Sequence, residues 1–323
     1  MVRTTPTRPV DVAALFPALA AHARPATRLH PRAGAPTAGQ SSVGGPLLWP
    51  AAEPWPFCDE SREDTFDPVT PETERRRRAI LGAAWARTPR GERLRITEAE
   101  RAELDEAEAA DPPELDGERV AMVPVVQLYR RDTPGFIGPA DADLLQVLWC
   151  PLDHPDHEYC PHVLVRWRTA AAVTAPLAAP PEPVAVGATY LPEPCAVHPE
   201  EVVEHQYLGL LPEELRGEIR AWEEGTGGFP YQYDLSIAPG WKLGGFASWH
   251  LTDPYPMDCD DCGAPMELLL VAASSEWDGG TGSWRPVEDE GEPEHDSLVA
   301  PHEPTFVQIG RGYSLWVFYC PRS

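Results

Sequence analysis

Lysine is almost missing from this sequence: Lys242 is the only one, and the other basic side chains are arginines. The 26 Lys and Arg residues face 51 Asp and Glu residues, which gives a formal net charge of −25. Such a field repels phosphate backbones, so it disfavours nucleic-acid binding and favours a basic protein or peptide partner. The only concentrated basic run, Arg75 to Arg78, is flanked by acidic residues and is predicted to be the solvated face of a helix.

Long apolar runs are missing too, because no stretch approaches the roughly 20 residues of a membrane-spanning helix. Residues 10–23 are apolar-rich, but Asp11 and Pro17 interrupt them, which argues against a signal peptide and predicts an amphipathic helix. We therefore expect a cytoplasmic protein without a membrane segment. In that compartment, seven cysteines indicate thiols or a metal site before disulfides.

The signatures of common catalytic folds are also absent from the sequence. It has no Walker A loop, no dinucleotide-binding fingerprint and no nucleophile elbow. The glycine-rich segment Gly225-Thr-Gly-Gly228 is followed by Pro230 where a phosphate-binding helix would begin, so we expect a turn. We assign no catalytic residue, and the sequence leans away from an enzyme.

What the sequence does contain is an internal repeat. Gly44-Gly45-Pro-Leu-Leu-Trp49 matches Gly244-Gly245-Phe-Ala-Ser-Trp249, and a proline corner followed by Cys58 or Cys259 comes next. Two segments rich in β-branched and aromatic residues then follow in each half, which is typical of strands. These segments are residues 122–128 and 145–151 in the first half, and residues 266–272 and 315–321 in the second.

We predict an α+β fold, internally duplicated, with mainly antiparallel β-rich halves and a few peripheral helices. The first half spans residues 1–168 and carries a charged helical insertion at 59–121. The second half spans residues 169–323, and the two halves are expected to pack as one globule.

Local signals predict the helices. Thr70-Pro71 marks a helix start, and Thr97 to Glu100 fits a capping box. Pro212 to Glu224 has the spacing of an amphipathic helix, with Gly225 as its stop. The acidic run Glu288-Asp289-Glu290 indicates a mobile surface loop.

Cys259-Asp-Asp-Cys262-Gly263 is the best metal-binding motif. Two thiolates at this spacing on a tight turn reach one tetrahedral ion, and the glycine lets the backbone curl around it. Cys320 is expected on the strand beside this turn as a third ligand, which predicts a structural zinc. The fourth ligand stays open between Cys195, His198 and water. The alternative is a set of buried or free thiols left from a decayed site.

The first half has Cys58 and Cys150 at the matching positions but no second cysteine near Cys58. A metal is therefore expected in the second half. Residues 150–162 include His154, His157 and His162, which suggests a second metal site or a hydrolytic centre. Because neither a nucleophile with its base nor a helical His-Glu-x-x-His accompanies them, we expect an exposed polar loop instead.

Aromatic side chains surround the two Gly-Gly corners. Trp49, Trp55, Trp249 and Tyr255 lie beside prolines and predicted strand edges, which makes them candidates for a peptide-binding groove. The alternative places most of them in the core between the two halves.

Taken as a set, these motifs resemble the YwqG-like family of uncharacterised bacterial proteins, which looks distantly similar to programmed-cell-death-two and Tsr-type ribosome-assembly proteins. The resemblance covers about Arg28 to Cys320 without the insertion, and includes the first-half apolar strand ending in Gln127. It implies an α+β fold with duplicated β-rich halves and no known enzymatic activity. Val271 stands where many members have a second glutamine.

Three functions are compatible with these observations. The first is a non-enzymatic protein- or peptide-binding module, chaperone-like or related to ribosome biogenesis, with a basic partner. The second is a toxin-immunity or stress-associated protein, since acidic inhibitors suit toxins that act on nucleic acids. The third is a metal-dependent hydrolase that uses residues 150–162.

Overall fold

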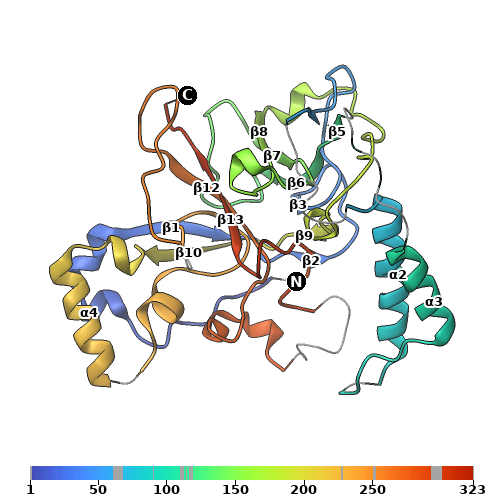
Figure 1. Cartoon of the computed structure of the whole chain (residues 1–323). Helices are drawn as coiled ribbons and strands as arrows, with labels where there is room; N and C mark the ends of the chain where they lie inside the picture. Colours follow the sequence, from blue (N-terminus) through green and yellow to red (C-terminus); the bar gives the residue numbers. More distant parts are fainter. Residues whose placement is uncertain are drawn as a thin grey trace.

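The protein is described by a computed structural model that covers residues 2–60, 68–89, 91–109, 113, 115, 119–226, 228–249, 252–291 and 300–322. Its fold is α+β with mainly antiparallel strands and few helices, which confirms that part of the predicted fold class. The helices α2 (Pro71–Arg87) and α3 (Glu98–Glu108) lie on one side of the sheets and α4 (Glu213–Thr226) on the other (Figure 1). Within the described ranges, every helix is too short or too polar to cross a membrane.

Two large antiparallel sheets form the centre of the molecule, and a two-stranded sheet lies beside them. Sheet A has the order β10 (Glu200–His205), β1 (Ala23–Arg28), β11 (Lys242–Gly244), β12 (Glu267–Ala273) and β13 (Ser314–Tyr319). Sheet B has the order β2 (Arg32–Ala33), β9 (Cys195–Ala196), β3 (Ser42–Val43), β6 (Val123–Tyr129), β7 (Leu144–Trp149) and β8 (Val163–Arg168). The small sheet pairs β4 (Phe57–Cys58) with β5 (Val120–Ala121).

The two halves of the chain exchange strands. β1 belongs to the first half but lies in sheet A between β10 and β11, whereas β9 belongs to the second half but lies in sheet B between β2 and β3. The boundary predicted between residues 168 and 169 therefore does not separate the two sheets. Each sheet needs one strand from the other half, so the halves cannot fold as independent units without leaving a gap in a sheet.

Three strands of each sheet correspond in register. Val43 of β3 pairs with Val126 of β6, and Leu243 of β11 pairs with Leu270 of β12. Val126 and Leu270 in turn lie opposite Val147 of β7 and Val317 of β13. An irregularity in register occurs just before Val126 in β6, between residues 124 and 126, and just before Leu270 in β12, between residues 268 and 270. These pairs are the ones that the sequence repeat aligns.

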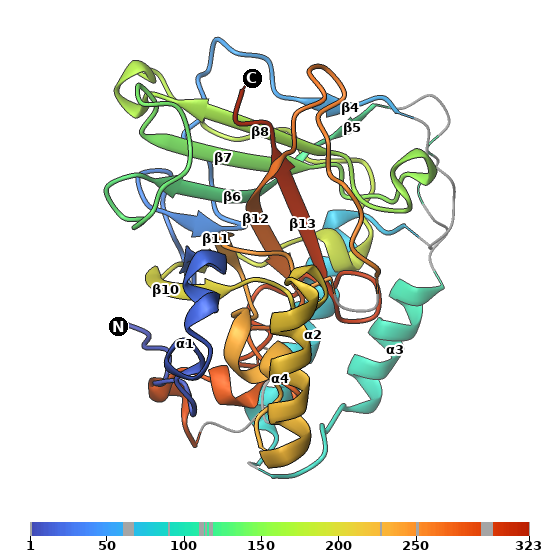
Figure 2. The same ribbon diagram turned by 90° about the vertical axis from the view of Figure 1, so that its left-hand side faces the viewer.

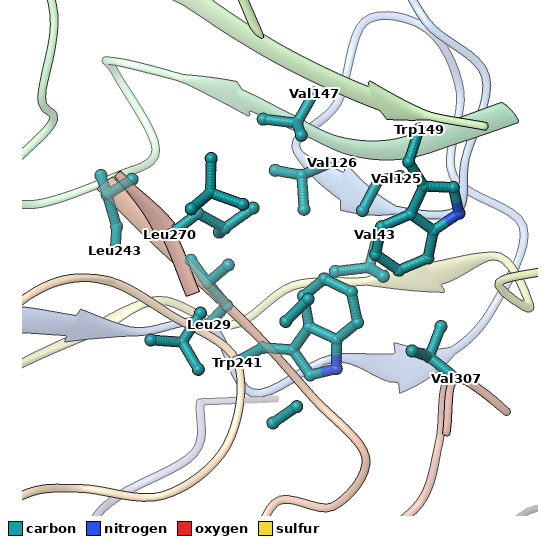
Figure 3. Close-up of a cluster of buried hydrophobic side chains, with 14 of the residues drawn as sticks. Leu29, Val43, Val125, Val126, Val147, Trp149, Trp241, Leu243, Leu270 and Val307 are labelled. Atoms are coloured by element: carbon teal, nitrogen blue, oxygen red, sulfur yellow. The ribbon is translucent and has the colours of Figure 1, made fainter. Parts of the chain in front are cut away.

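The core lies where sheet A crosses sheet B (Figure 2). Figure 3 shows Val126, Val147 and Trp149 facing Trp241 and Leu270 across this layer. Each side chain of this kind stabilises the fold by about 1.5–3 kcal/mol when it is fully buried. Because one cluster draws on strands of both sheets, the halves form one packed unit.

The predicted helix starts are confirmed. The Thr70 side chain accepts a hydrogen bond from the Thr73 amide, and Pro71 follows at the first helical position. Thr97 and Glu100 form the complete capping box of α3. α4 buries Leu215 and Ile219 and continues to Thr226, past the predicted stop.

The single N-terminal helix was a wrong prediction. Residues 10–23 instead form α1 (Val12–Leu15) and the 3₁₀ helix η1 (Pro17–His22). The break falls at Pro17, because proline has no amide proton and its ring clashes with the preceding turn.

Two charged segments expected in solvent are partly buried. Arg78 is 7 % exposed; its Nε donates to Glu74 at 2.7 Å and its Nη2 donates to the Ala188 and Leu191 carbonyls at 2.9 Å. Asp289 is 2 % exposed and forms ion pairs with Arg3 and Arg32, so this acidic run is a docked turn. Arg78 and Asp289 are buried for the same reason. A buried charge is tolerated where opposite charges or carbonyls pair with it, and here those partners come from distant segments of the chain.

A further charged network lies under sheet A around His30, which is 0 % exposed. Its Nδ1 lies 3.0 Å from Glu276 Oε2, and its Nε2 lies 3.4 Å from Glu200 Oε2. The Thr5 amide also donates to Glu200 at 2.8 Å. Burial by itself would raise the pKa of Glu200, but hydrogen bonds from His30 and Thr5 outweigh it and lower that pKa to about 2.

This network predicts a defined acid sensitivity. The pKa of Glu200 lies at about 2 in the folded protein, against an ordinary value of 4.5, so its contribution to stability is complete above about pH 4.5 and is lost as pH falls to about 2. Glu200→Gln should lower the free energy of unfolding at pH 7 and flatten its pH dependence between these limits. Urea unfolding at several pH values measures this; an unchanged slope in the variant would contradict it.

Candidate metal centres

The second-half cysteines converge. The sulfur atoms of Cys259, Cys262 and Cys320 all lie within 4.8 Å of one another, and Cys262 Sγ is 3.5 Å from Cys320 Sγ. Cys262 is exposed, Cys259 is half-buried and Cys320, directly after β13, is buried. The sequence predicted this arrangement, and its three thiols could hold a metal ion at the molecular surface.

The turn that carries Cys259 and Cys262 is closed by backbone hydrogen bonds. The Gly263 amide donates to the Cys259 carbonyl at 2.8 Å, and the Cys259 amide donates to the Ala264 carbonyl at 2.8 Å. Gly263 has φ +64°, a conformation that a residue with a Cβ adopts only at a cost. The glycine therefore lets the chain reverse tightly enough for both thiols to face the same point.

The first half contains a second group, made of Cys58, Cys150 and His154. Cys58 ends β4, Cys150 directly follows β7, and His154 precedes the short 3₁₀ helix η2 (Pro155–His157). Cys58 Sγ lies 3.7 Å from His154 Nε2, and the three side chains are almost completely buried. A hydrogen bond from Cys150, together with His154 and against the effect of burial, lowers the pKa of Cys58 to about 4.

This group corrects the expectation of an exposed polar loop at residues 150–162. His154 is 0 % exposed, because the turn after β7 folds its ring inward against Cys58. Potential metal ligands therefore occur in both halves, and not in the second alone. The sequence could not show this, because Cys58 and His154 are 96 residues apart.

The other two histidines of this loop lie nearer the surface and share one carboxylate. Glu60 Oε2 is 2.6 Å from His157 Nε2, and Glu60 Oε1 is 2.6 Å from His162 Nδ1. Burial by itself would raise the pKa of Glu60, but these two imidazoles outweigh it and lower that pKa. The three side chains are between 32 % and 42 % exposed, and they form a third group whose ligand atoms lie close enough to hold a metal ion, although it contains no thiol.

Two proposed fourth ligands of the second-half group lie elsewhere. Cys195 is buried in β9 of sheet B, where its thiol donates to the Pro304 carbonyl at 3.2 Å and burial raises its pKa to about 12. The His198 amide donates to the Leu29 carbonyl at 2.7 Å, at the crossing from β9 to β10. Neither belongs to the ligand group of Cys259, so of the suggestions from sequence only water remains.

The aromatic residues proposed for a groove are mostly core. Trp49, Trp55 and Trp249 are 1 %, 8 % and 6 % exposed, whereas Tyr255 is 49 % exposed. The Trp49 and Trp55 rings pack 5.1 Å apart, and the Trp249 ring lies 5.6 Å from that of Tyr255. The three indoles thus stabilise the corners behind the Gly-Gly turns, and only Tyr255 offers its side chain to a ligand.

Sequence reasoning missed one repeated pair. His30-Pro31 follows β1 and His198-Pro199 follows β9, at the two places where the chain passes from one sheet to the other. His-Pro occurs three times in the sequence, the third time at His154-Pro155, so only the strand exchange shows which two copies lie at a crossing. No family model and no curated protein matches this sequence.

Proposed function

We propose that this protein binds zinc at two structural thiolate centres, one at the same corner of each large sheet. The observation that supports this proposal is that the cysteines occupy equivalent positions in the two halves. Cys58 and Cys259 each follow a proline corner, and Cys150 and Cys320 each follow the strand that corresponds in register, β7 or β13. In both halves this pair meets a third ligand, which is His154 or Cys262.

One interatomic distance in each group fits zinc coordination. With Zn–S bonds of about 2.3 Å and Zn–N bonds of about 2.0–2.1 Å, tetrahedral coordination separates two sulfurs by about 3.8 Å and a sulfur from a nitrogen by about 3.6 Å. The corresponding distances are 3.5 Å for Cys262 to Cys320 and 3.7 Å for Cys58 to His154. Thiolate and imidazole ligands select zinc over magnesium, calcium or manganese.

Each centre would tie a loop to a strand. Cys58 and Cys259 lie at the ends of long proline-rich segments, whereas Cys150 and Cys320 are fixed by the sheets. A metal bound between them stabilises the folded chain because the unfolded chain has no preformed site. None of the seven cysteines, all of which lie in the described residues, forms a disulfide, which also supports a reducing, cytoplasmic location.

Metal stoichiometry tests the proposal. Purified protein should contain two zinc ions per chain by mass spectrometry. Each single variant, Cys58→Ser or Cys320→Ser, should contain one. Cys195→Ser is the matched control, because Cys195 is a buried thiol outside both groups, and it should retain two. Protein that binds no zinc when refolded in its presence would overturn the proposal.

We propose partner binding as a second, non-enzymatic function, for which the charge distribution is the specific observation. Residues 243–284 contain no lysine or arginine but seven Asp and Glu residues. Six of these seven residues, all except the buried Glu276, are exposed. Exposed carboxylates attract a basic protein segment and accelerate its association at low salt. This distribution is compatible with a chaperone-like or ribosome-biogenesis role and with binding of a basic toxin.

A further inference from the structure

The third ligand group, which contains no cysteine, lies beside the thiolate group of the first half. It consists of Glu60, His157 and His162, whose ligand atoms all lie within 4.8 Å of one another. Glu60 is separated from Cys58 by one residue. The ring of the buried His154 lies 5.9 Å from that of His157 and 6.3 Å from that of His162. A buried set of ligands and a partly exposed set therefore meet at the same corner of the molecule.

Three different elements position the members of this group. Glu60 lies two residues beyond β4. His162 directly precedes β8, and its carbonyl accepts a hydrogen bond from the Cys150 amide at 2.9 Å, which extends the pairing of β7 with β8. His157 ends η2, where its amide donates to the His154 carbonyl at 3.0 Å. The backbone therefore fixes both histidines, and the sheets hold two of the three members.

The loop between the two histidines reverses direction sharply. Glu158 and Tyr159 have φ of 55° and 61°, which is the left-handed conformation. Residues with a Cβ seldom adopt it, and they keep it where the surrounding structure holds them there. The Cys160 amide donates to the His157 carbonyl at 2.9 Å and closes the turn. This reversal brings the ring centroids of His157 and His162 to 5.4 Å from each other.

Ion pairing does not account for the whole group. His157 Nε2 forms a hydrogen bond with Glu60 Oε2 at 2.6 Å. His162 Nδ1 lies equally close to Glu60 Oε1, but this nitrogen is buried and makes no hydrogen bond of normal geometry with any residue that the structure describes. A buried polar atom without a hydrogen bond calls for another partner, such as an ion. A metal ion between imidazole and carboxylate supplies one.

The ligand types and the local charge indicate which ion fits. Imidazole ligands suit zinc and its neighbouring transition metals, whereas magnesium and calcium prefer oxygen ligands alone. Residues 150–165 contain three Asp and Glu residues and no lysine or arginine, so the local field attracts cations. Coordination bonds of about 2.0–2.2 Å place ligand atoms about 3.0–3.6 Å apart, so the 2.6 Å contacts need to open by about 1 Å or less.

We propose that Glu60, His157 and His162 form a third metal site, which binds one exchangeable divalent transition-metal ion with water in its remaining coordination positions. Three protein ligands on a partly exposed corner leave such positions free, which distinguishes an open site from a closed structural one. This inference goes beyond the two proposed zinc centres and does not depend on them, because none of its ligands is a thiol.

Cobalt(II) is the probe, added to the whole protein after dialysis against metal-free buffer. We expect one cobalt ion per chain to bind in addition to the zinc that survives dialysis, with weak d–d absorption and no thiolate-to-cobalt charge-transfer band. Cobalt that replaces zinc at a thiolate centre would show that intense band instead. The proposal would be overturned if millimolar cobalt did not bind, or if all bound cobalt showed thiolate charge transfer.

Two variants locate the ion. His157→Gln and His162→Gln should each weaken cobalt binding by at least about tenfold, because the loss of a group that only orients a metal ligand already costs that much. His22→Gln is the matched control, since His22 ends η1 outside every candidate group, and it should bind cobalt as wild type does. Circular dichroism checks that each variant is folded.

Equal affinity of wild type and both loop variants would place the cobalt elsewhere and overturn the proposal. Zinc content measured on the same samples keeps the two metal proposals separate. Two zinc ions per chain without cobalt binding would contradict this inference alone. Cobalt bound without thiolate charge transfer in protein that holds no zinc would support this inference and contradict the zinc centres.

Discussion

Glu204→Ala is expected to lower the free energy of unfolding by about 3–5 kcal/mol, because it leaves the ammonium of Lys242 buried without its counter-charge. Lys242 and Glu204 are 2 % and 0 % exposed, and Lys242 Nζ donates to the two carboxylate oxygens at 2.6 and 2.8 Å. Burial lowers the pKa of Lys242 while Glu204 opposes that change. Without Glu204, the lysine must either lose its proton or admit water to the core.

Glu204 also orders the turn behind the second Gly-Gly motif. Its carboxylate accepts hydrogen bonds from the Ala238 and Phe246 amides, both at 2.9 Å. Gly245 faces it so closely that a Cβ there would lie 2.2 Å from Glu204 Oε2. The ion pair between Lys242 and Glu204 therefore also stabilises this turn. Position 245 requires glycine because the Glu204 carboxylate leaves no room for a Cβ.

Urea unfolding of wild type and variant at pH 7 measures the effect. Glu201→Ala is the matched control, because Glu201 lies on the same strand with its side chain exposed, and it should change stability by less than about 0.5 kcal/mol. A loss below about 1 kcal/mol for Glu204→Ala would show that the pair is dispensable.

Removal of zinc is expected to give the second large effect. A metal that binds only the folded chain stabilises it by about 4 kcal/mol when its free concentration is about 1,000 times its Kd. For a chain of 323 residues that corresponds to roughly 6 °C in Tm for each site. Chelation should therefore lower the thermal midpoint strongly, and added zinc should restore it.

The double variant Cys58→Ser/Cys320→Ser provides the comparison for this prediction. It lacks one ligand in each group, so its thermal midpoint should already be low and should not respond to chelator. Wild-type protein that loses all its zinc while keeping its Tm would show that the centres do not stabilise the fold. A lower Tm after chelation would instead show that the metal centres stabilise the fold.

Features set by neighbouring residues could be predicted from the sequence. The caps of α2 and α3, the β-rich segments and the Cys259–Cys262 turn each depend on side chains within a few positions, where backbone geometry alone brings them together. The convergence of Cys320 with that turn was also predictable, because the repeat places it at the end of a strand beside the turn.

Only the tertiary structure decided the remainder. The exchange of β1 and β9 between the sheets, the meeting of Cys58 with His154 and the burial of Lys242 against Glu204 all join segments far apart in the chain. No local pattern encodes them, since a buried charge or thiol is stabilised by partners that packing supplies. The near absence of lysine was visible in the sequence. That the single lysine is buried in sheet A and paired with Glu204 of the edge strand β10 was decided by folding.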